Sequence, residues 1–188
     1  LRDDYAGQLD ATGQDYLRRV AEAAARMDNL IQDLLAYGRL SRADLKPEVV
    51  NLAGVVAEAL EQLQGEVART GAQVTMAEAL PAVTGHHATL LQAVANLLSN
   101  AIKFAKPDAP PRIRVQSESH DGRVRLWVED NGIGIDPEYH ERIFRVFERL
   151  HGVETYPGTG IGLAIVRKGM ERLGGQSGVE SKPGEGSR

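Results

Sequence analysis

The chain has 188 residues, of which 42% are hydrophobic and 26% are charged, and its 22 basic and 26 acidic residues give a formal net charge of −4. Enough of it is apolar to build a core, which excludes global disorder, and the small negative charge gives no reason to expect a nucleic-acid partner. It has no cysteine and no apolar run near the roughly 20 residues that cross a bilayer, so we expect a cytoplasmic location, no disulfide and no membrane segment.

The first predicted element is a long amphipathic helix over residues 11–40, which is roughly 45 Å at about 1.5 Å per residue. Thr12 followed by Asp15 resembles a capping box, which makes Thr12 the expected N-cap. Residues 1–9 are too few to cover the apolar side of such a helix, so we expect a homodimer through helix 11–40 rather than a helix packed on its own domain. The apolar seam consists of Leu17, Val20, Ala24, Met27, Ile31 and Leu34.

From Pro47 onward the pattern changes to short strands alternating with helices. This pattern predicts an α+β sandwich, with one mixed sheet and helices on one face. The Asp-Gly pair at 121–122 is a turn signal between two antiparallel strands. We expect strands at 49–52, 73–76, 82–84, 112–119, 123–129 and near 179–181, and helices at 52–69, at 87–103, from Pro137 and from Gly160 to about Leu173.

Four short motifs stand in order in the second half of the chain. On the predicted helix 87–103, Asn96 and Asn100 are four residues apart and share one face, which Lys103 extends. Two carboxamides and an ammonium group suit a triphosphate with Mg²⁺, an ion that prefers oxygen ligands and keeps several waters. Alone, these residues would also fit a solvated polar stripe. The motifs are NLLSNAIKF at 96–104, DNGIG at 130–134, FRVF at 144–147 and GTGIGL at 158–163.

Two of the other motifs are glycine-rich and lie at ends of predicted elements. DNGIG follows a strand and by itself would be an ordinary Asn-Gly turn. GTGIGL opens a helix, and helix N-termini present unpaired N–H groups to phosphate. It is not a Walker loop, because no Gly-Lys-Ser or Gly-Lys-Thr occurs, and Leu163 takes the place of the third glycine of a dinucleotide fingerprint.

In this order and spacing the four motifs resemble the N, G1, F and G2 boxes of sensor histidine kinases. Residues 47–188 look like the catalytic ATP-binding domain, whose Bergerat-type fold is shared with gyrase, heat-shock and mismatch-repair ATPases. Residues 1–46 look like the second half of the dimerisation and histidine-phosphotransfer hairpin, and 149–166 resembles the phytochrome-like subgroup. The sequence departs from the family at Ser177-Gly178, where apolar strand residues are usual, and in an incomplete final box.

The resemblance implies ATP and Mg²⁺ as cofactors. It implies that Asp130 accepts a hydrogen bond from the adenine amino group, which selects ATP over GTP because a carboxylate cannot donate to the guanine oxygen. It makes residues 148–157 an ATP lid with Arg149 and His151 near phosphate. Phe144 and Phe147 are the expected packing anchors of that lid.

The resemblance assigns three kinds of site residue. The catalytic residues are Asn96, Lys103 and Arg149, and the metal ligand is Asn100. The nucleotide-binding residues are Asn96, Asn100, Lys103, Asp130, Gly132, Gly134, Ile135, Phe147, Arg149, Gly158, Thr159, Gly160, Gly162 and Leu163.

Asn96 favours a kinase over an ATPase. ATP-hydrolysing relatives carry a glutamate there as a general base, whereas an amide cannot take a proton. An imidazole attacks phosphorus through its own lone pair, which leaves positioning and charge stabilisation to the protein. A Bergerat-type ATPase and a non-catalytic dimeric ATP-binding module remain as alternatives.

Histidines are absent from residues 1–85, the region that resembles the phospho-acceptor hairpin. We therefore expect that this chain does not autophosphorylate, that it is cut from a longer protein with an upstream sensor domain, and that its partner is a response regulator receiver domain. We interpret four of the five histidines, His86, His87, His120 and His140, as structural or solvated.

Overall fold

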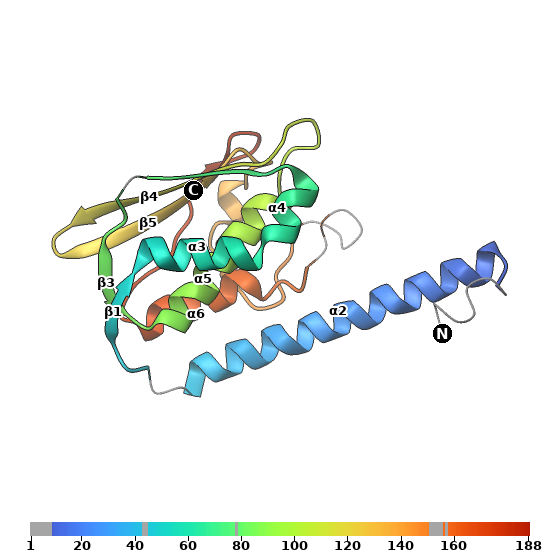
Figure 1. Cartoon of the computed structure of the whole chain (residues 1–188), viewed down its shortest axis with the longest axis horizontal. Coiled ribbons are helices and arrows are strands. Elements are labelled where there is room, and N and C mark those ends of the chain that lie inside the picture. The colour runs from blue at the N-terminus through green and yellow to red at the C-terminus, as the bar shows by residue number, and fades with distance from the viewer. Residues whose placement is uncertain (1–8, 43–44, 78, 151–155, 157) are drawn as a thin grey trace.

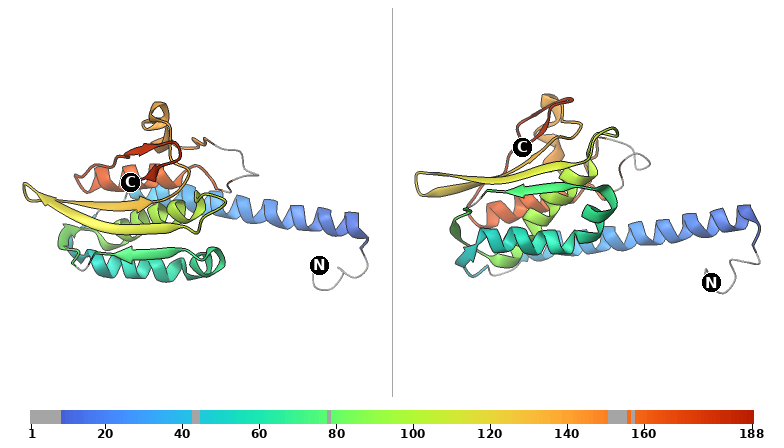
Figure 2. Two further views of the ribbon diagram at one scale, coloured as in Figure 1. Left: turned by 90° about the horizontal axis from the view of Figure 1, so that it is seen from above. Right: turned by 45° about the horizontal axis from the view of Figure 1, so that its top comes forward.

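The structure is a computed structural model that describes residues 9–42, 45–77, 79–150, 156 and 158–188. A long helix, α2 (Ala11–Arg42), lies beneath a layered α/β domain and extends past it (Figure 1). In that domain the helices cover one face of a twisted sheet (Figure 2). The predicted α+β sandwich is therefore confirmed. Within the described residues, no helix is long and apolar enough to cross a membrane.

The main sheet has five strands in the order β2-β4-β5-β7-β6. Strands β2 and β4 pair in parallel and the other neighbours pair antiparallel, so the sheet is mixed as predicted. A second sheet pairs β1 with β3. The strands are β1 (Glu48–Asn51), β2 (Gln73–Met76), β3 (Ala82–Gly85), β4 (Arg112–His120), β5 (Arg123–Asp130), β6 (Ser181–Lys182) and β7 (Gly186–Ser187).

The helices of the domain depart from the sequence prediction at two places. The helix expected over 52–69 is broken at Leu63, which has a non-helical backbone at φ −97° and ψ 7°. Asp136 does cap the segment after it, by accepting from the amide of Glu138 at 3.0 Å, but only a short 3₁₀ turn follows. The helical elements are α3 (Leu52–Gln62), α4 (Gln64–Thr70), α5 (His87–Lys103), η2 (Pro137–Tyr139), η3 (Arg142–Phe144) and α6 (Gly162–Arg172).

The main core lies between the sheet and helices α3 and α5. Strand β4 alternates as a half-buried strand should, with Ile113 and Val115 buried and Arg112 and Arg114 exposed. Helix α5 contributes Leu98, which has no exposed surface, to the same cluster. Each large side chain buried in this way contributes roughly 1.5–3 kcal/mol, so α5 is held firmly on the sheet.

Helix α2 begins one residue before the predicted cap. The Oδ1 atom of Asp10 accepts from the amide of Gly13 at 2.7 Å, so Asp10 is the N-cap and the prediction of Thr12 is wrong. An aspartate at this position satisfies one of the helix's unpaired amides.

The C-terminal part of α2 packs on its own domain, where Leu40 is buried against Ile161 and Ile165 of the α6 segment. The expectation that the helix does not pack on its own domain is therefore wrong for this part. Farther from the domain the seam stays uncovered, and the side chain of Ile31 is 54% exposed. The other exposed seam residues include Val20, Met27 and Leu34.

Candidate nucleotide-binding site

The first part of the site, which we name the base end, is formed by Asp130, Gly132 and Ser187. Asp130 is the last residue of β5, and its Oδ1 atom accepts from the amides of Gly132 at 2.8 Å and Ser187 at 3.2 Å. Burial raises the pKa of Asp130, and these two backbone hydrogen bonds act against that rise. The carboxylate is thus fixed by the main chain, and its second oxygen can accept from a ligand.

Glycines at the base end allow close approach between segments of the chain itself. Gly134 has φ 71°, and an added Cβ would overlap the carbonyl oxygen of Lys182. Gly186 has φ 83°, and an added Cβ there would overlap the carbonyl oxygen of Asp130. L-residues with a side chain rarely adopt such φ values. The close contact made at these two glycines is therefore with the protein's own backbone.

The last residues of the chain complete the base end. The Oγ atom of Ser181 accepts from the amide of Ile135 at 2.8 Å and donates to the carbonyl oxygen of Gly186 at 2.7 Å. The amide of Gly184 donates to the carbonyl oxygen of Ile133 at 2.7 Å. Sequence reasoning missed Ser181 and Ser187, although the glycines at 184 and 186 signal a tight backbone there.

The second part of the site, the phosphate end, is formed by Asn96, Lys103, Arg149 and Thr159. Helix α5 places Asn96 and Lys103 against the glycine-rich turn before α6. An added Cβ at Gly162 would lie 2.9 Å from the Oδ1 atom of Asn96, and one at Gly158 would lie 3.0 Å from the Nζ atom of Lys103. Asn100 lies between them on the same helix and is half-buried. The structure thus brings the first and last sequence motifs together.

The ammonium group of Lys103 lies in a crowded electrostatic setting. Burial lowers the pKa of Lys103, and the positive charge of Arg149 lowers it further. The carboxylates of Glu66 and Asp33 act in the opposite direction. A phosphate placed beside Lys103 would offset the same burial, because an anion favours the charged form of the amine.

Arg149 contacts the backbone of the loop that leads into α6. Its guanidinium donates to the carbonyl oxygens of Gly158 and Tyr156, and the bond to Tyr156 measures 2.8 Å. The ring of Tyr156 lies 5.1 Å from that of Phe104, between centroids. The cation expected near phosphate is therefore bonded to its own chain in this structure.

The two phenylalanines of the FRVF motif differ in their surroundings. Phe144 is buried with the guanidinium of Arg167 4.6 Å from its ring centroid, as expected for a packing anchor. Phe147 is 59% exposed and has φ 66°, with its amide donating to Gly160 at 2.9 Å. The prediction that Phe147 is a packing anchor is therefore wrong. The predicted lid residue His151 lies outside the described residues.

Thr159 links the start of α6 to helix α2. Its hydroxyl donates to the Oδ2 atom of Asp33 at 2.5 Å and accepts from the amide of Ile161 at 3.3 Å. Ile161 is fully buried, and α6 begins at the next residue, Gly162, followed by the half-buried Leu163. Sequence reasoning missed the contact with Asp33.

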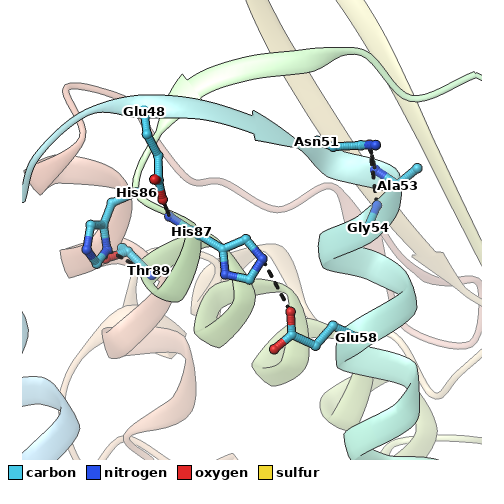
Figure 3. A network of polar contacts seen from close by, with 8 residues as sticks. All are labelled: Glu48, Asn51, Ala53, Gly54, Glu58, His86, His87 and Thr89. Atoms are coloured by element: carbon cyan, nitrogen blue, oxygen red, sulfur yellow. Dashed lines mark hydrogen bonds and ion pairs between the residues drawn. The ribbon is translucent and has the colours of Figure 1, made fainter.

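The other end of α5 carries a polar network rather than a site for a metal (Figure 3). The Nδ1 atom of His86 accepts from the amide of Thr89 at 3.4 Å and so caps the helix. His87 pairs with Glu58 at 3.3 Å, and its amide donates to Glu48 at 3.2 Å. Over the part of the chain that the structure describes, no group of three or more His, Cys, Asp or Glu residues could hold a metal.

The donors at the phosphate end fit a magnesium ion that arrives with its phosphates. Mg²⁺ takes oxygen ligands and keeps several waters, so one protein oxygen can be enough when phosphate oxygens supply others. The half-buried carboxamide of Asn100, between Asn96 and Lys103, is one such neutral oxygen donor.

Comparison with known proteins identifies the class of this fold and site. The family model of histidine kinase-, DNA gyrase B- and HSP90-like ATPases matches residues 85–188. Cyanobacterial phytochrome A of Nostoc sp. is 38% identical over 183 residues, which are 97% of this chain and 24% of that protein. Phytochrome-like protein Cph1 of Synechocystis sp. is 37% identical, again over 97% of this chain and 24% of that protein.

A solved structure agrees with the sequence comparisons. Full-length ShkA in complex with AMPPNP superimposes with a TM-score of 0.75 and 29% identity, over 95% of this chain and 38% of that one. The chain therefore belongs to the family of histidine kinase-, DNA gyrase B- and HSP90-like ATPases. Its relatives include proteins named as histidine kinases, among them sensor histidine kinase AruS of Pseudomonas aeruginosa, which is 34% identical over all of this chain and 19% of that protein. The chain spans 24% of the length of the two phytochromes.

Proposed function

We propose that this chain is the ATP-binding catalytic core of a sensor histidine kinase. In this proposal it transfers the terminal phosphate of ATP to a histidine, for relay to an aspartate of a response regulator, under the control of an upstream sensor domain. The observation that carries this proposal is that Asn96 and Lys103 on α5 lie against the glycine-rich turn that leads into α6. Asp130 at the end of β5 supports the proposal, because its fixed carboxylate can accept from a base.

The residues of the chain bind and orient the nucleotide. Asp130 accepts from the adenine amino group, and Lys103 and Arg149 offset the negative charge of the phosphates. The amides of Gly162 and Leu163 at the start of α6 face the phosphates as a helix N-terminus does. Asn100 would hold Mg²⁺, which would supply positive charge that offsets the negative charge of the phosphates.

The phosphoryl transfer itself needs no base from Asn96. The lone pair of a neutral imidazole nitrogen forms the bond to the terminal phosphorus. The bond from that phosphorus to the bridging oxygen breaks, and its electron pair leaves with ADP. An amide at position 96 helps to position this reaction but cannot activate water.

The phospho-acceptor in this proposal is not one of the histidines of this chain. Residues 1–85 contain none, so helix α2 carries none, and His86 and His87 are held in the polar network at the start of α5. Incubation with ATP labelled on its terminal phosphate should leave no acid-labile label on the chain, although calorimetry shows that it binds Mg·ATP. Stable phosphohistidine on any of its five histidines would contradict this part of the proposal.

A measurement of phosphate release distinguishes the proposed kinase function from the rival ATPase function. A kinase core alone should bind ATP without steady hydrolysis, because Asn96, which stands where ATP-hydrolysing relatives carry a glutamate, is an amide and cannot take a proton from water. We expect no release above the buffer rate, both in the unaltered chain and in Asn96→Ala. Steady release that Asn96→Ala abolishes would favour the ATPase.

We also propose that the chain forms a homodimer through helix α2. The support is the seam left exposed beyond the packed end of the helix, where Ile31 is 54% exposed. Burying each large apolar side chain contributes roughly 1.5–3 kcal/mol, and a symmetric dimer is the commonest arrangement. Light scattering should show a dimer that Ile31→Asp converts to a monomer with ATP binding retained. The control Gln32→Asp adds the same charge at a neighbouring exposed position, and a chain that is monomeric at about 100 micromolar would contradict the dimer.

A further inference from the structure

Helix α2 reaches into the phosphate end of the site through Asp33. The Oδ2 atom of Asp33 accepts from the hydroxyl of Thr159 at 2.5 Å, across 126 positions of the sequence. The same hydroxyl oxygen accepts from the amide of Ile161. Because apolar contacts of α2 with Ile161 and Ile165 hold the helix alongside this turn, the position of Asp33 depends on the docking of α2.

The charge of Asp33 belongs to the same cluster as the cations of the site. Burial lowers the pKa of Lys103, and the carboxylates of Glu66 and Asp33 act against that lowering because they favour the charged ammonium group. Lys103 in turn lies against Gly158, the residue before Thr159. A negative side chain from α2 thus shares the surroundings in which Lys103 and Thr159 would meet phosphate.

We propose that Asp33 is a specificity-determining residue that makes the docked site favour a nucleoside diphosphate over a triphosphate. This inference rests on the proposed function, since it concerns the same phosphate end. The terminal phosphate would bring further negative charge close to the carboxylate of Asp33 beside Lys103. It would also meet a Thr159 hydroxyl that already donates its hydrogen bond to Asp33. Like charges at close range repel, and the repulsion grows where water is partly excluded.

The coupling is reciprocal, as every binding equilibrium requires. If docked α2 weakens binding of the triphosphate by some factor, the triphosphate weakens docking of α2 by the same factor. A diphosphate lacks the terminal group and has a smaller effect. Loading with ATP therefore loosens α2 from the domain more than loading with ADP does.

The first test measures the dissociation constants of Mg·ATP and Mg·ADP by calorimetry. In Asp33→Asn, which keeps the shape and one acceptor oxygen, the preference for ATP over ADP should rise roughly fivefold or more. The control Asp28→Asn removes the same charge from an exposed position of α2 and should leave the ratio unchanged. An unchanged ratio in Asp33→Asn, or an equal rise in Asp28→Asn, overturns the inference. A chain that binds neither nucleotide instead overturns the proposed function.

The second test follows the docking of α2 directly. The chain has no cysteine, so spin labels at Glu22→Cys and Glu171→Cys, both exposed, report the separation of α2 from α6. Dilution with unlabelled chain removes distances between protomers. Mg·ATP should broaden the distance distribution and Mg·ADP should leave it narrow, and this difference should disappear in Asp33→Asn. Equal distributions with the two nucleotides in the otherwise unaltered chain overturn the inference.

Discussion

The base end and the phosphate end of the site are held by different kinds of interaction. At the base end, Asp130 is held by amides of Gly132 and Ser187, and glycines allow neighbouring segments to touch. At the phosphate end, the side chains of Arg149 and Thr159 bond to groups of the chain itself that lie on a loop and on helix α2. The first arrangement depends on backbone and the second on side chains from distant elements.

This difference has a consequence for binding. A group held by the main chain is preorganised, so little free energy is needed to order it around a ligand. A side chain that already has a partner must exchange it, and only the difference between the two interactions contributes to affinity. Substitutions at the base end should therefore have large effects on folding or binding, and removal of a phosphate-end cation should have a small net effect.

The largest effect is expected from Gly186→Ala. Gly186 has φ 83°, and its missing Cβ leaves room for the carbonyl group of Asp130. The substitution combines backbone strain with steric overlap, and it should lower the free energy of unfolding by roughly 3 kcal/mol or more. Gly178→Ala is the control, because nothing lies within 4 Å of its added Cβ. Urea unfolding with equal midpoints for the two variants would show that the base end tolerates rearrangement.

The next largest effect is a loss of ATP affinity in Asp130→Asn, since Asp130 is the proposed hydrogen-bond acceptor for the adenine base. In EDTA, Asp130→Asn should weaken ATP binding by roughly 1–3 kcal/mol, because an amide donor replaces part of a carboxylate that only accepts. Asn100→Ala should change little without Mg²⁺, since Asn100 acts through the metal. Calorimetry that gives equal losses for both variants would contradict the division of the site into two ends.

A smaller effect is expected from Arg149→Ala. The guanidinium of Arg149 must give up the carbonyl oxygens of Tyr156 and Gly158 before it can bind phosphate. The net loss of ATP affinity should therefore stay below about 1 kcal/mol, within the range of an exchanged hydrogen bond. Arg145→Ala removes an equal charge from an exposed position in the same segment and serves as the control. A loss as large as that of Asp130→Asn would show that both ends are preorganised.

Much of the fold could be predicted because local signals agree with tertiary packing. Helix α5 runs from His87 to Lys103 as predicted, since its apolar residues fall on one face and that face is buried. The hairpin of β4 and β5 follows from the Asp-Gly turn at 121–122, where Asp121 has φ 48°. The break at Leu63 was missed, because the apolar pattern continues across it from α3 into α4.

The parts of the site that escaped prediction come from contacts across the sequence. The bond from Thr159 to Asp33 joins residues 126 positions apart, and neither residue carries a local sign of the other. Ser187 reaches Asp130 through its amide, which sequence cannot distinguish from any other amide. Phe147 looks like a core residue by type, but it has a positive φ and its side chain is exposed. Sequence motifs predict which residues gather, whereas the partners that hold them depend on the fold.

The smallest effect is a pH dependence at the base end. Burial raises the pKa of Asp130 above the ordinary 3.8, and the amides of Gly132 and Ser187 partly oppose this, which keeps the effect small. The folded chain therefore holds the proton of Asp130 at pH values where the unfolded chain has lost it. Its contribution to stability is fully present below the ordinary pKa and is lost as pH rises through the raised value.

The same ionisation should favour binding, which gives the two properties opposite slopes. The ionised carboxylate is the stronger acceptor for the adenine amino group, so ATP affinity should rise with pH across the window in which stability relative to Asp130→Asn falls. Urea unfolding and calorimetry on both chains, from about pH 3.5 to 7, test this, and the difference between the chains cancels the other titrating groups. Curves that run parallel for the two chains would mean that Asp130 has an ordinary pKa in the folded protein. The base end would then be open to water, and it would lose the preorganisation that separates it from the phosphate end.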